Sequence, residues 1–263
     1  MRLFWIICSK SIQKQLAYRT AALAGLVTNL FFGLLRAAVL IALYGTQTVV
    51  TGISLEGAIT YTGITQAIIG YLSLFNWYEL MNSVYTGAVA TDLVKPLSYY
   101  RLWLAQDFGR ALAQLLLRGT PIIVIYALLF RISSPTRASQ WLLLLVSLLL
   151  AWSVSFSWRF LLNLSSFWVP NATGILRFGF LISWFFSGFL MPIRYFPDWF
   201  QKLCYLTPFP HMINTVVEIY LGVVSGSELL SLILFQAAWA IGLMIICKLV
   251  LWAGIRRLVI LGG

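Results

Sequence analysis

Six long apolar runs, separated by short polar segments, dominate this chain. A helix needs roughly 20 apolar residues to cross a bilayer. Five runs meet this length with few charged positions: residues 21–44, 57–81, 139–162, 174–191 and 229–253. A sixth run, 108–130, contains Arg118 and Pro121. The pattern predicts an all-α polytopic membrane protein with six transmembrane helices and one domain, residues 1–263.

The first 19 residues mix apolar and basic positions. Leu3, Phe4, Ile7, Ile12 and Leu16 stand among polar and basic residues, which is typical of an amphipathic helix lying on a membrane surface. We therefore predict an interfacial helix over residues 1–19. An N-terminal extension of the first span is the alternative. Without a small-residue cleavage site before the first apolar run, we expect no cleaved signal peptide.

The segment that follows the fifth run is broken by prolines. Residues 187–210 read SGFLMPIRYFPDWFQKLCYLTPFP, with four prolines among short aromatic pieces. Broken backbone at membrane depth is tolerated only where it is buried in protein or lines a cavity. We therefore predict a re-entrant helical hairpin over residues 192–222 that borders a substrate path. Its outer gate is assigned to Ser187, Gly188, Pro192, Pro197 and Pro208.

His211 and Glu218 follow the last proline break. They stand seven residues apart, so one helical face can carry both. The spacing is compatible with a proton relay, but a solvated outer face is the simpler interpretation. Their roles stay open at this point.

The distribution of basic residues predicts the orientation. Six spans place both termini on one side, and the positive-inside rule selects that side. With cytoplasmic termini, twelve Lys and Arg residues lie inside and four lie outside. The inner residues are Arg2, Lys10, Lys14, Arg19, Lys95, Arg101, Arg110, Arg159, Arg177, Lys248, Arg256 and Arg257, and the outer ones are Arg131, Arg137, Arg194 and Lys202. Arg36, near the outer end of the first span, is expected to snorkel.

Composition agrees with a membrane protein and argues against an enzyme. The chain is 61% hydrophobic with a formal net charge of +11, and the acidic groups facing its basic residues are expected to be lipid headgroups rather than nucleic acid. It contains one histidine and three cysteines, without metal-ligand spacing. A GxxxxGK[ST] phosphate-binding loop is also absent from the sequence. We expect no catalytic residue, metal or cofactor in this chain.

The longest inner connection, residues 82–107, is rich in aromatic residues. Asp92 can cap a short helix, Pro96 breaks the segment, and Tyr99, Tyr100 and Trp103 offer large anchors. Such patches are typical of interface hot spots. A partner-binding loop and a loop lying among lipid headgroups fit the pattern equally well.

Two charged positions within the apolar runs are candidate sites. Glu79 and Arg110 lie near the inner ends of the second and third spans, where an ion pair is predicted with a structural role. Arg118 lies about ten residues into the third span. A charge at that depth faces the interior, stabilised by carbonyls that Pro121 leaves free. It either contacts an anionic substrate group along the pathway or supports a subunit seam.

Several short motifs, taken in order, resemble one family of membrane proteins. They are residues 18–19 (YR), Gly87, 92–97 (DLVKPL), 107–110 (DFGR), 118–121 (RGTP), 167–168 (FW), 187–192 (SGFLMP), 196–197 (FP), 208–209 (PF), 218–220 (EIY) and 262–263 (GG). Together the chain resembles the membrane subunit, or permease, of bacterial ABC-2-type transporters that have a separate ATPase polypeptide.

The resemblance implies an ABCG-like exporter fold in the bacterial cytoplasmic (inner) membrane. Two permeases, identical or homologous, are expected to pair around a central pathway, each on a nucleotide-binding subunit that holds ATP and Mg²⁺. The N-terminal helix corresponds to the connecting helix. The segment corresponding to the coupling helix comprises Asp92, Leu93, Val94, Lys95, Pro96, Leu97, Tyr99 and Tyr100.

The expected function is export of a hydrophobic or amphipathic substrate by alternating access. A non-transporting membrane anchor for an ATPase complex is the main alternative, although an anchor has no need of a buried arginine and a broken hairpin. A lipid-modifying membrane enzyme is a third class, which the missing catalytic constellation disfavours.

Overall fold

The computed structural model describes residues 2–75 and 77–257, most of which are helical. The N-terminal half contains α1 (Arg2–Ala17), α2 (Arg19–Tyr44), α3 (Leu55–Leu72), α4 (Glu79–Tyr85), α5 (Val89–Leu93), α6 (Tyr99–Gln114) and α7 (Thr120–Leu129). The C-terminal half contains α8 (Ala138–Leu164), α9 (Thr173–Phe186), α10 (Asp198–Tyr205), α11 (Asn214–Leu221) and α12 (Gly226–Ile255). Two short strands, β1 (Val49–Val50) and β2 (Ile53–Ser54), form an antiparallel turn. The Gly262–Gly263 motif lies outside the described residues.

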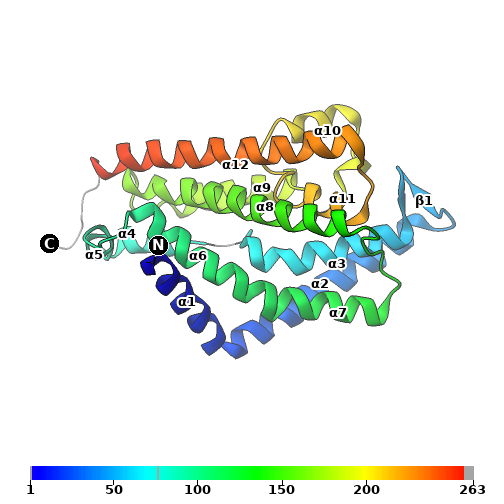
Figure 1. The fold of residues 1–263 in the computed structure, drawn as a ribbon, viewed down its shortest axis with the longest axis horizontal. Helices are drawn as coiled ribbons and strands as arrows, with labels where there is room; N and C mark the ends of the chain where they lie inside the picture. The colour runs from blue at the N-terminus through cyan, green and yellow to red at the C-terminus, as the bar shows by residue number, and fades with distance from the viewer. Residues whose placement is uncertain (1, 76, 258–263) are drawn as a thin grey trace.

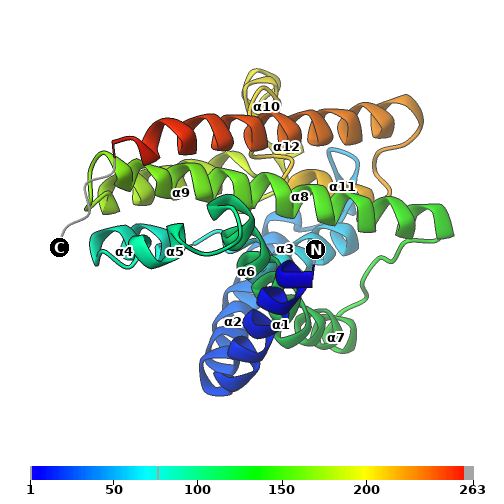
Figure 2. The same cartoon turned by 60° about the vertical axis from the view of Figure 1, so that its left-hand side comes forward.

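The helices form two groups joined by α3 and α6. Figure 1 shows α8 and α12 running side by side along the length of the molecule. Figure 2 shows α1, α2 and α7 projecting away from the pair of α8 and α12. One end of the molecule carries α4, α5 and the C-terminal end of α12, and the other carries the β-turn, α10 and α11 (Figure 1).

Four helical stretches of the described chain are long and apolar enough to cross a membrane. They are Arg19–Tyr44, Tyr99–Leu129, Ala138–Phe167 and Gly226–Ile255. The other two predicted runs form helices as well, but α3 has 18 residues and buries Thr60, Thr62, Thr65 and Gln66, while α9 has only 14 residues. The prediction of a helical chain is therefore confirmed, and four of the six predicted spans meet the criteria for a crossing helix.

The second apolar run is not one helix, as the sequence pattern predicted. Helix α3 ends at Leu72, because Ser73 adopts a left-handed conformation with φ 55°. The chain resumes helical structure at Glu79, in the seven-residue α4. The predicted span 57–81 thus contains a break, which we call the α3 break: residues 73–75 and 77–78.

The third apolar run begins earlier than predicted. Its helix starts at Tyr99 rather than near residue 108, and Tyr99, Tyr100 and Trp103 are buried in an aromatic cluster. The helix contains a π-helical turn, Leu115–Gly119, immediately before α7. The turn lies just before Pro121, which lacks a backbone N–H. Single π-helical turns widen a helix and occur frequently at functional sites.

The N-terminal helix is fixed to α6. The Ser11 hydroxyl donates to the Gln106 carbonyl at 2.6 Å, and Gln114 donates to the side chain of Gln15 at 2.7 Å. Gly109 permits this approach, because a Cβ atom there would lie 2.3 Å from the Cys8 carbonyl oxygen. Helix α1 is therefore a separate element, which ends at Ala17, rather than a continuous extension of α2.

Candidate functional site

The α3 break exposes backbone carbonyls that side chains from three other helices satisfy. The last carbonyls of a helix have no partner within the helix. Arg110 of α6 donates to the carbonyls of Gly70 and Tyr71 at 2.8 and 3.1 Å, and Ser155 of α8 donates to that of Leu72 at 2.7 Å. The cationic guanidinium also complements the negative end of the helix dipole. Helix α3 can therefore end inside the protein without unpaired carbonyls at these positions.

The remainder of the break is held in the same way. Trp184 of α9 donates its indole N–H to the Leu74 carbonyl at 2.8 Å. Asn163 of α8 donates to the Trp77 carbonyl at 2.8 Å and accepts from the Met81 backbone N–H at 3.0 Å. The break is therefore an ordered, internally capped interruption, fixed by α6, α8 and α9.

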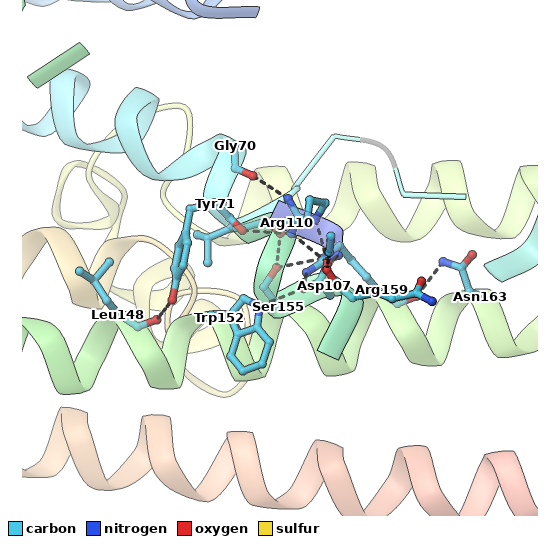
Figure 3. A network of polar contacts seen from close by, with 12 residues as sticks. Gly70, Tyr71, Asp107, Arg110, Leu148, Trp152, Ser155, Arg159 and Asn163 are labelled. Atoms are coloured by element: carbon cyan, nitrogen blue, oxygen red, sulfur yellow. Dashed lines mark hydrogen bonds and ion pairs between the residues drawn. The ribbon is translucent and has the colours of Figure 1, made fainter. Parts of the chain in front are cut away.

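Asp107 is the centre of this arrangement (Figure 3). Its two carboxylate oxygens accept four hydrogen bonds of 2.9 Å, two from Arg159, one from Arg110 and one from the Trp152 indole. The carboxylate is completely buried, and the Arg159 side chain is 1% exposed. Four donors match the acceptor capacity of an ionised carboxylate, and the paired contacts from Arg159 are the strongest type of ion pair.

Groups of the α3 break and the end of α3 stabilise the excess positive charge of the ion cluster of Asp107, Arg110 and Arg159. Two guanidinium groups face one carboxylate, which leaves a formal excess of one positive charge. The α3 carbonyls accept from Arg110, and the Arg159 guanidinium lies 5.2 Å from the Trp77 ring centroid. Buried charges are retained only when they are paired and hydrogen-bonded. The cluster thus joins α3, α6 and α8 at one point.

The predicted Glu79–Arg110 ion pair is not formed. Arg110 instead pairs with Asp107 at 2.9 Å on its own helix. The prediction assumed that the second run continues as a helix to residue 81, so that the two side chains lie at equal depth. Because α3 ends at Leu72, Glu79 belongs to a different helix, and the nearby carbonyls and Asp107 occupy the Arg110 donors.

Two cavities lie beside the α3 break, and Arg110 lines both. The smaller, of about 200 Å³, is bordered by Asn29, Ser73, Phe75, Gln114 and Arg118. The larger, of about 460 Å³, lies between α1 and α6 and includes Trp77 and Glu79. We call them the α2 cavity and the α1 cavity. A broken helix bordered by cavities is the arrangement in which irregular backbone is tolerated at membrane depth.

Arg118 faces the α2 cavity, but its partner differs from the predicted one. Its Nη2 donates to the Ala21 carbonyl of α2 at 3.0 Å, rather than to a carbonyl freed by Pro121. Gly25 makes space for the guanidinium, since a Cβ atom there would overlap it. The Arg118 Nε has no hydrogen-bond partner among the described residues. The side chain therefore retains donor capacity beside the cavity.

The segment predicted to contact a partner divides into an exposed and a buried part. Val94 is 82% exposed, and Lys95 and Pro96 are exposed beside it. Lys95 pairs with Asp92 at 2.6 Å, while Leu93 and Leu97 are half-buried. Tyr99 and Tyr100, which were predicted as anchors, are instead part of the protein core at 5% and 6% exposure. The sequence did not distinguish these aromatic residues because the start of α6 was placed too late.

The predicted outer gate is held by hydrogen bonds around Asn214. Its side-chain oxygen accepts from the Tyr61 hydroxyl at 3.0 Å and the Ile193 backbone N–H at 3.1 Å, and its amide donates to Tyr205 at 2.9 Å. Gly188 has φ +79°, and its carbonyl accepts from Tyr61 at 2.6 Å. The chain between α9 and α12 is thus broken into short helices, as predicted, and is tied to α3.

The predicted gate residues have distinct positions around this network. Ser187 is buried, and its carbonyl accepts from the Asn214 backbone N–H at 3.1 Å. Pro192 precedes a 3-10 turn, and Pro197 immediately precedes α10. Pro208 lies in the turn between α10 and α11. The prolines therefore mark the ends of the short helices.

Arg36 turns inward rather than toward the membrane surface. It donates to the Phe189 carbonyl at 2.6 Å and to the Thr65 hydroxyl, and its guanidinium lies 4.7 Å from the Phe189 ring centroid. The snorkelling prediction was wrong because the turn after Gly188 presents a free carbonyl to α2. Arg36 therefore links α2, α3 and the predicted gate.

His211 and Glu218 are buried, which contradicts the interpretation as a solvated face. Glu218 pairs with Arg194 at 2.6 Å, and Tyr205 donates to it at 3.3 Å. The His211 imidazole contacts the Thr215 hydroxyl at 3.2 Å, and burial lowers the pKa of His211 to about 4. The two side chains have different partners, so neither donates to the other.

The sequence interpretation missed Asp107 and Arg159 as a site. Both were treated as residues of inner ends, with Arg159 counted only toward orientation. The signal was the spacing of Asp107 and Arg110, three residues apart on one helical face, together with an arginine within an apolar run. Asn214 and Tyr61 were also missed, since their contacts join segments more than 100 residues apart.

A comparison with known protein families identifies this architecture. Residues 30–262 match the model of the family described as ABC-2 family transporter protein. A search among curated proteins gives no match. The match covers most of the chain, including the ion cluster and the predicted gate, but it begins after α1, which forms one wall of the α1 cavity. The chain therefore belongs to the ABC-2 family of transporter membrane proteins.

Proposed function

We propose that this chain is the permease of an ATP-driven exporter whose ATPase is a separate subunit. One observation supports this most directly: the exposed segment 94–96 lies close before α6, and α6 carries Asp107 and Arg110 into the buried cluster. Movement of that segment is transmitted to α3 and α8 through the ion pairs. The chain has no phosphate-binding loop, so ATP and Mg²⁺ bind the partner.

The α5 end of the molecule faces the cytoplasm in this proposal. Helices α4 and α5 share this end with the C-terminal end of α12 (Figure 1), where Arg256 and Arg257 are exposed. Even without Arg110 and Arg159, which are buried in the ion cluster, the basic residues stay biased toward this side. Both termini are then cytoplasmic, α1 lies on the inner leaflet, and the protein is multi-pass in the bacterial inner membrane.

The six apolar helical runs act as six spans, with the hairpin of residues 192–222 re-entering from outside. The Asn214 network closes the outer end, with Ser187, Gly188, Pro192, Pro197 and Pro208 at its bends. Two permeases, identical or homologous, form the pathway between them. Alternating access follows when the ATPase pulls on residues 92–97 and the α3 break transmits the displacement.

Arg118 is the proposed contact for an anionic group of the cargo. It lines the α2 cavity with an unpaired Nε, and the apolar surfaces of Phe75 and Ile69 border the same space. The cargo class is therefore hydrophobic or amphipathic, with an acidic group. Substitution by Lys keeps the charge but loses the fork-shaped donor, so R118K should raise the cargo concentration needed for half-maximal ATPase stimulation.

The coupling assignment is tested by Val94→Asp, with Val49→Asp as a matched control. Val94 is 82% exposed at the α5 end and Val49 is 57% exposed at the opposite end. Loss of an interface hot spot weakens binding by more than about tenfold. We expect V94D to insert normally but to lose ATPase co-purification, whereas V49D retains it. Equal co-purification of both variants would refute the coupling role of segment 94–96.

Transport itself is tested separately in the reconstituted complex. Stimulation of ATPase activity by a cargo, with accumulation of that cargo on one side of the vesicle, supports the exporter. A complex that binds its ATPase but shows neither response is the membrane anchor.

A further inference from the structure

We infer that the α1 cavity is a binding site for one anionic phospholipid. The cavity has a volume of about 460 Å³ and opens between α1, the start of α6 and residues 95–97. This size suits a small-molecule ligand. The inference goes beyond the transport proposal, since a bound lipid of this kind is a structural partner rather than cargo.

The walls of the α1 cavity separate into an apolar and a basic part. Leu3, Ile6 and Ile7 of α1 provide the apolar side. Lys10, Lys14 and Lys95 provide three ammonium groups, all exposed. An apolar strip beside a group of lysines matches an acyl chain attached to a negatively charged headgroup.

The charge balance at the α1 cavity favours an anion. Glu79 and Asp107 are the acidic residues among its lining, and the Asp107 carboxylate is already neutralised by Arg110 and Arg159. Lys95 is paired with Asp92 at 2.6 Å, while Lys10 contacts only the neutral Gln13 amide at 3.2 Å. The lysines of α1 therefore have no carboxylate partner among the described residues.

A buried donor without a partner also borders the cavity. Trp103 is 5% exposed, lines the cavity, and its indole Nε1 has no hydrogen-bond partner in the described part of the chain. Buried indole N–H groups usually find an acceptor. Protein atoms cover Nε1 in the structure, so a phosphate or glycerol oxygen of a lipid headgroup supplies an acceptor after a small movement of the surrounding side chains.

The position of the cavity gives the lipid a role. Its lining joins α1, segment 95–97 and the ion cluster at Arg110, so a bound lipid holds together the elements that move in the transport cycle. Helix α1 is fixed at Ser11 and Gln15 by direct hydrogen bonds. We therefore expect the lipid to order the N-terminal half of α1 rather than its C-terminal half.

The test is native mass spectrometry of the full-length protein, with its co-purified partner, in neutral detergent. Phosphatidylglycerol and phosphatidylcholine with identical acyl chains are added in parallel. We expect phosphatidylglycerol to bind at least about tenfold more tightly, and the double variant K10A/K14A to lose about tenfold or more of that affinity. The matched control K202A/K248A removes the same charge elsewhere and should bind like the wild type.

Two results would overturn the inference. One is equal phosphatidylglycerol affinity for K10A/K14A and K202A/K248A, since it would show only a general attraction to a basic protein. The other is displacement of phosphatidylglycerol by glycerol phosphate at equal concentration, which would show that the apolar wall contributes nothing. Because Lys10 and Lys14 are exposed, their removal leaves folding intact, and an unchanged melting temperature verifies this.

Discussion

The α3 break and the predicted outer gate both bury charged residues, but they do so differently. At the break, Asp107 receives four hydrogen bonds and Arg159 is 1% exposed. At the gate, Arg194 is 28% exposed and bridges buried Glu218 to exposed Glu228. A guanidinium with access to water loses less stabilising free energy when its partner moves away, because water solvates the charge. The comparison supports the proposal that the break transmits movement as a unit and that the predicted gate rearranges.

The hydrogen-bond network around Asn214 at the predicted gate is also simpler than the ion cluster at the α3 break. Asn214 supplies single hydrogen bonds to neutral partners on α3, the 3-10 turn and α10. A neutral hydrogen bond contributes about 1 kcal/mol net, so the network can open at modest cost. The ion cluster, in contrast, cannot lose Asp107 without leaving two buried guanidinium groups unpaired.

The largest effect is expected for Asp107→Ala. Two guanidinium groups then stay buried without a carboxylate, which costs about 3–5 kcal/mol. We expect a large fall in melting temperature and in monodisperse yield from detergent extracts. The exposed Asp198→Ala is the matched control and should change stability by less than about 0.5 kcal/mol.

A second substitution sharpens this prediction. The double variant D107A/R159M removes one of the orphaned charges along with the carboxylate, so it should recover part of the loss seen in D107A. A melting temperature for D107A equal to that of D198A would contradict the claim that the ion cluster at the α3 break depends on its buried carboxylate.

An intermediate effect is expected for Asn214→Ala. The Ile193 N–H loses its acceptor, at a cost of about 1–3 kcal/mol, whereas the Tyr61 hydroxyl keeps the Gly188 carbonyl. Hydrogen exchange should therefore accelerate in residues 188–205 but not in residues 70–75 at the end of α3. Asn82→Ala, an exposed position at the opposite end, is the control. Equal acceleration at both ends would show that the gate has no independent opening.

The sequence predicted the helical class and most run boundaries, because apolar length alone determines them. The ends of α2, α8 and α12 lie within about three residues of the predicted positions, whereas α9 ends at Phe186 rather than at residue 191. The break after Leu72 was missed because no proline or glycine occurs between residues 73 and 78. Ser73 adopts a left-handed conformation there, and side chains from α6, α8 and α9 satisfy the surrounding carbonyls. Tertiary contacts of this kind leave little local signal.

The candidate site was predicted less well for the same reason. Arg118 was expected to face the interior, and it does line a cavity, but its partner Ala21 lies 97 residues away in the chain. Arg110 was identified with the wrong acidic partner, although Asp107 stands three residues before it. A sequence states which charges occur in apolar runs; which of them meet depends on where each helix ends.

The smallest predicted effect concerns pH and again separates the two regions. Burial lowers the pKa of His211 to about 4, below the value near 6.5 of an exposed imidazole. The unfolded gate therefore binds a proton that the folded gate excludes, and stability falls as the pH falls from 7.5 to 5.5, by about 1 kcal/mol. Thr215 contacts the ring, the Tyr205 ring lies nearby, and Asp198, Lys202 and Glu228 line the adjoining cavity.

Hydrogen exchange at the two pH values, corrected for the intrinsic rate, measures this difference for the gate and the α3 break in one experiment. We expect the free energy of opening to fall with pH for residues 188–221 in the wild type, and to lose this dependence in His211→Gln. Burial also raises the pKa of the Glu218 carboxyl, so the difference between the wild type and His211→Gln isolates the contribution of the imidazole. The same pH dependence in both proteins would mean that the imidazole is not held neutral by burial. The pH dependence would then no longer distinguish the predicted gate from the α3 break. The proposed contrast between the two regions would rest on their hydrogen bonds and ion pairs alone.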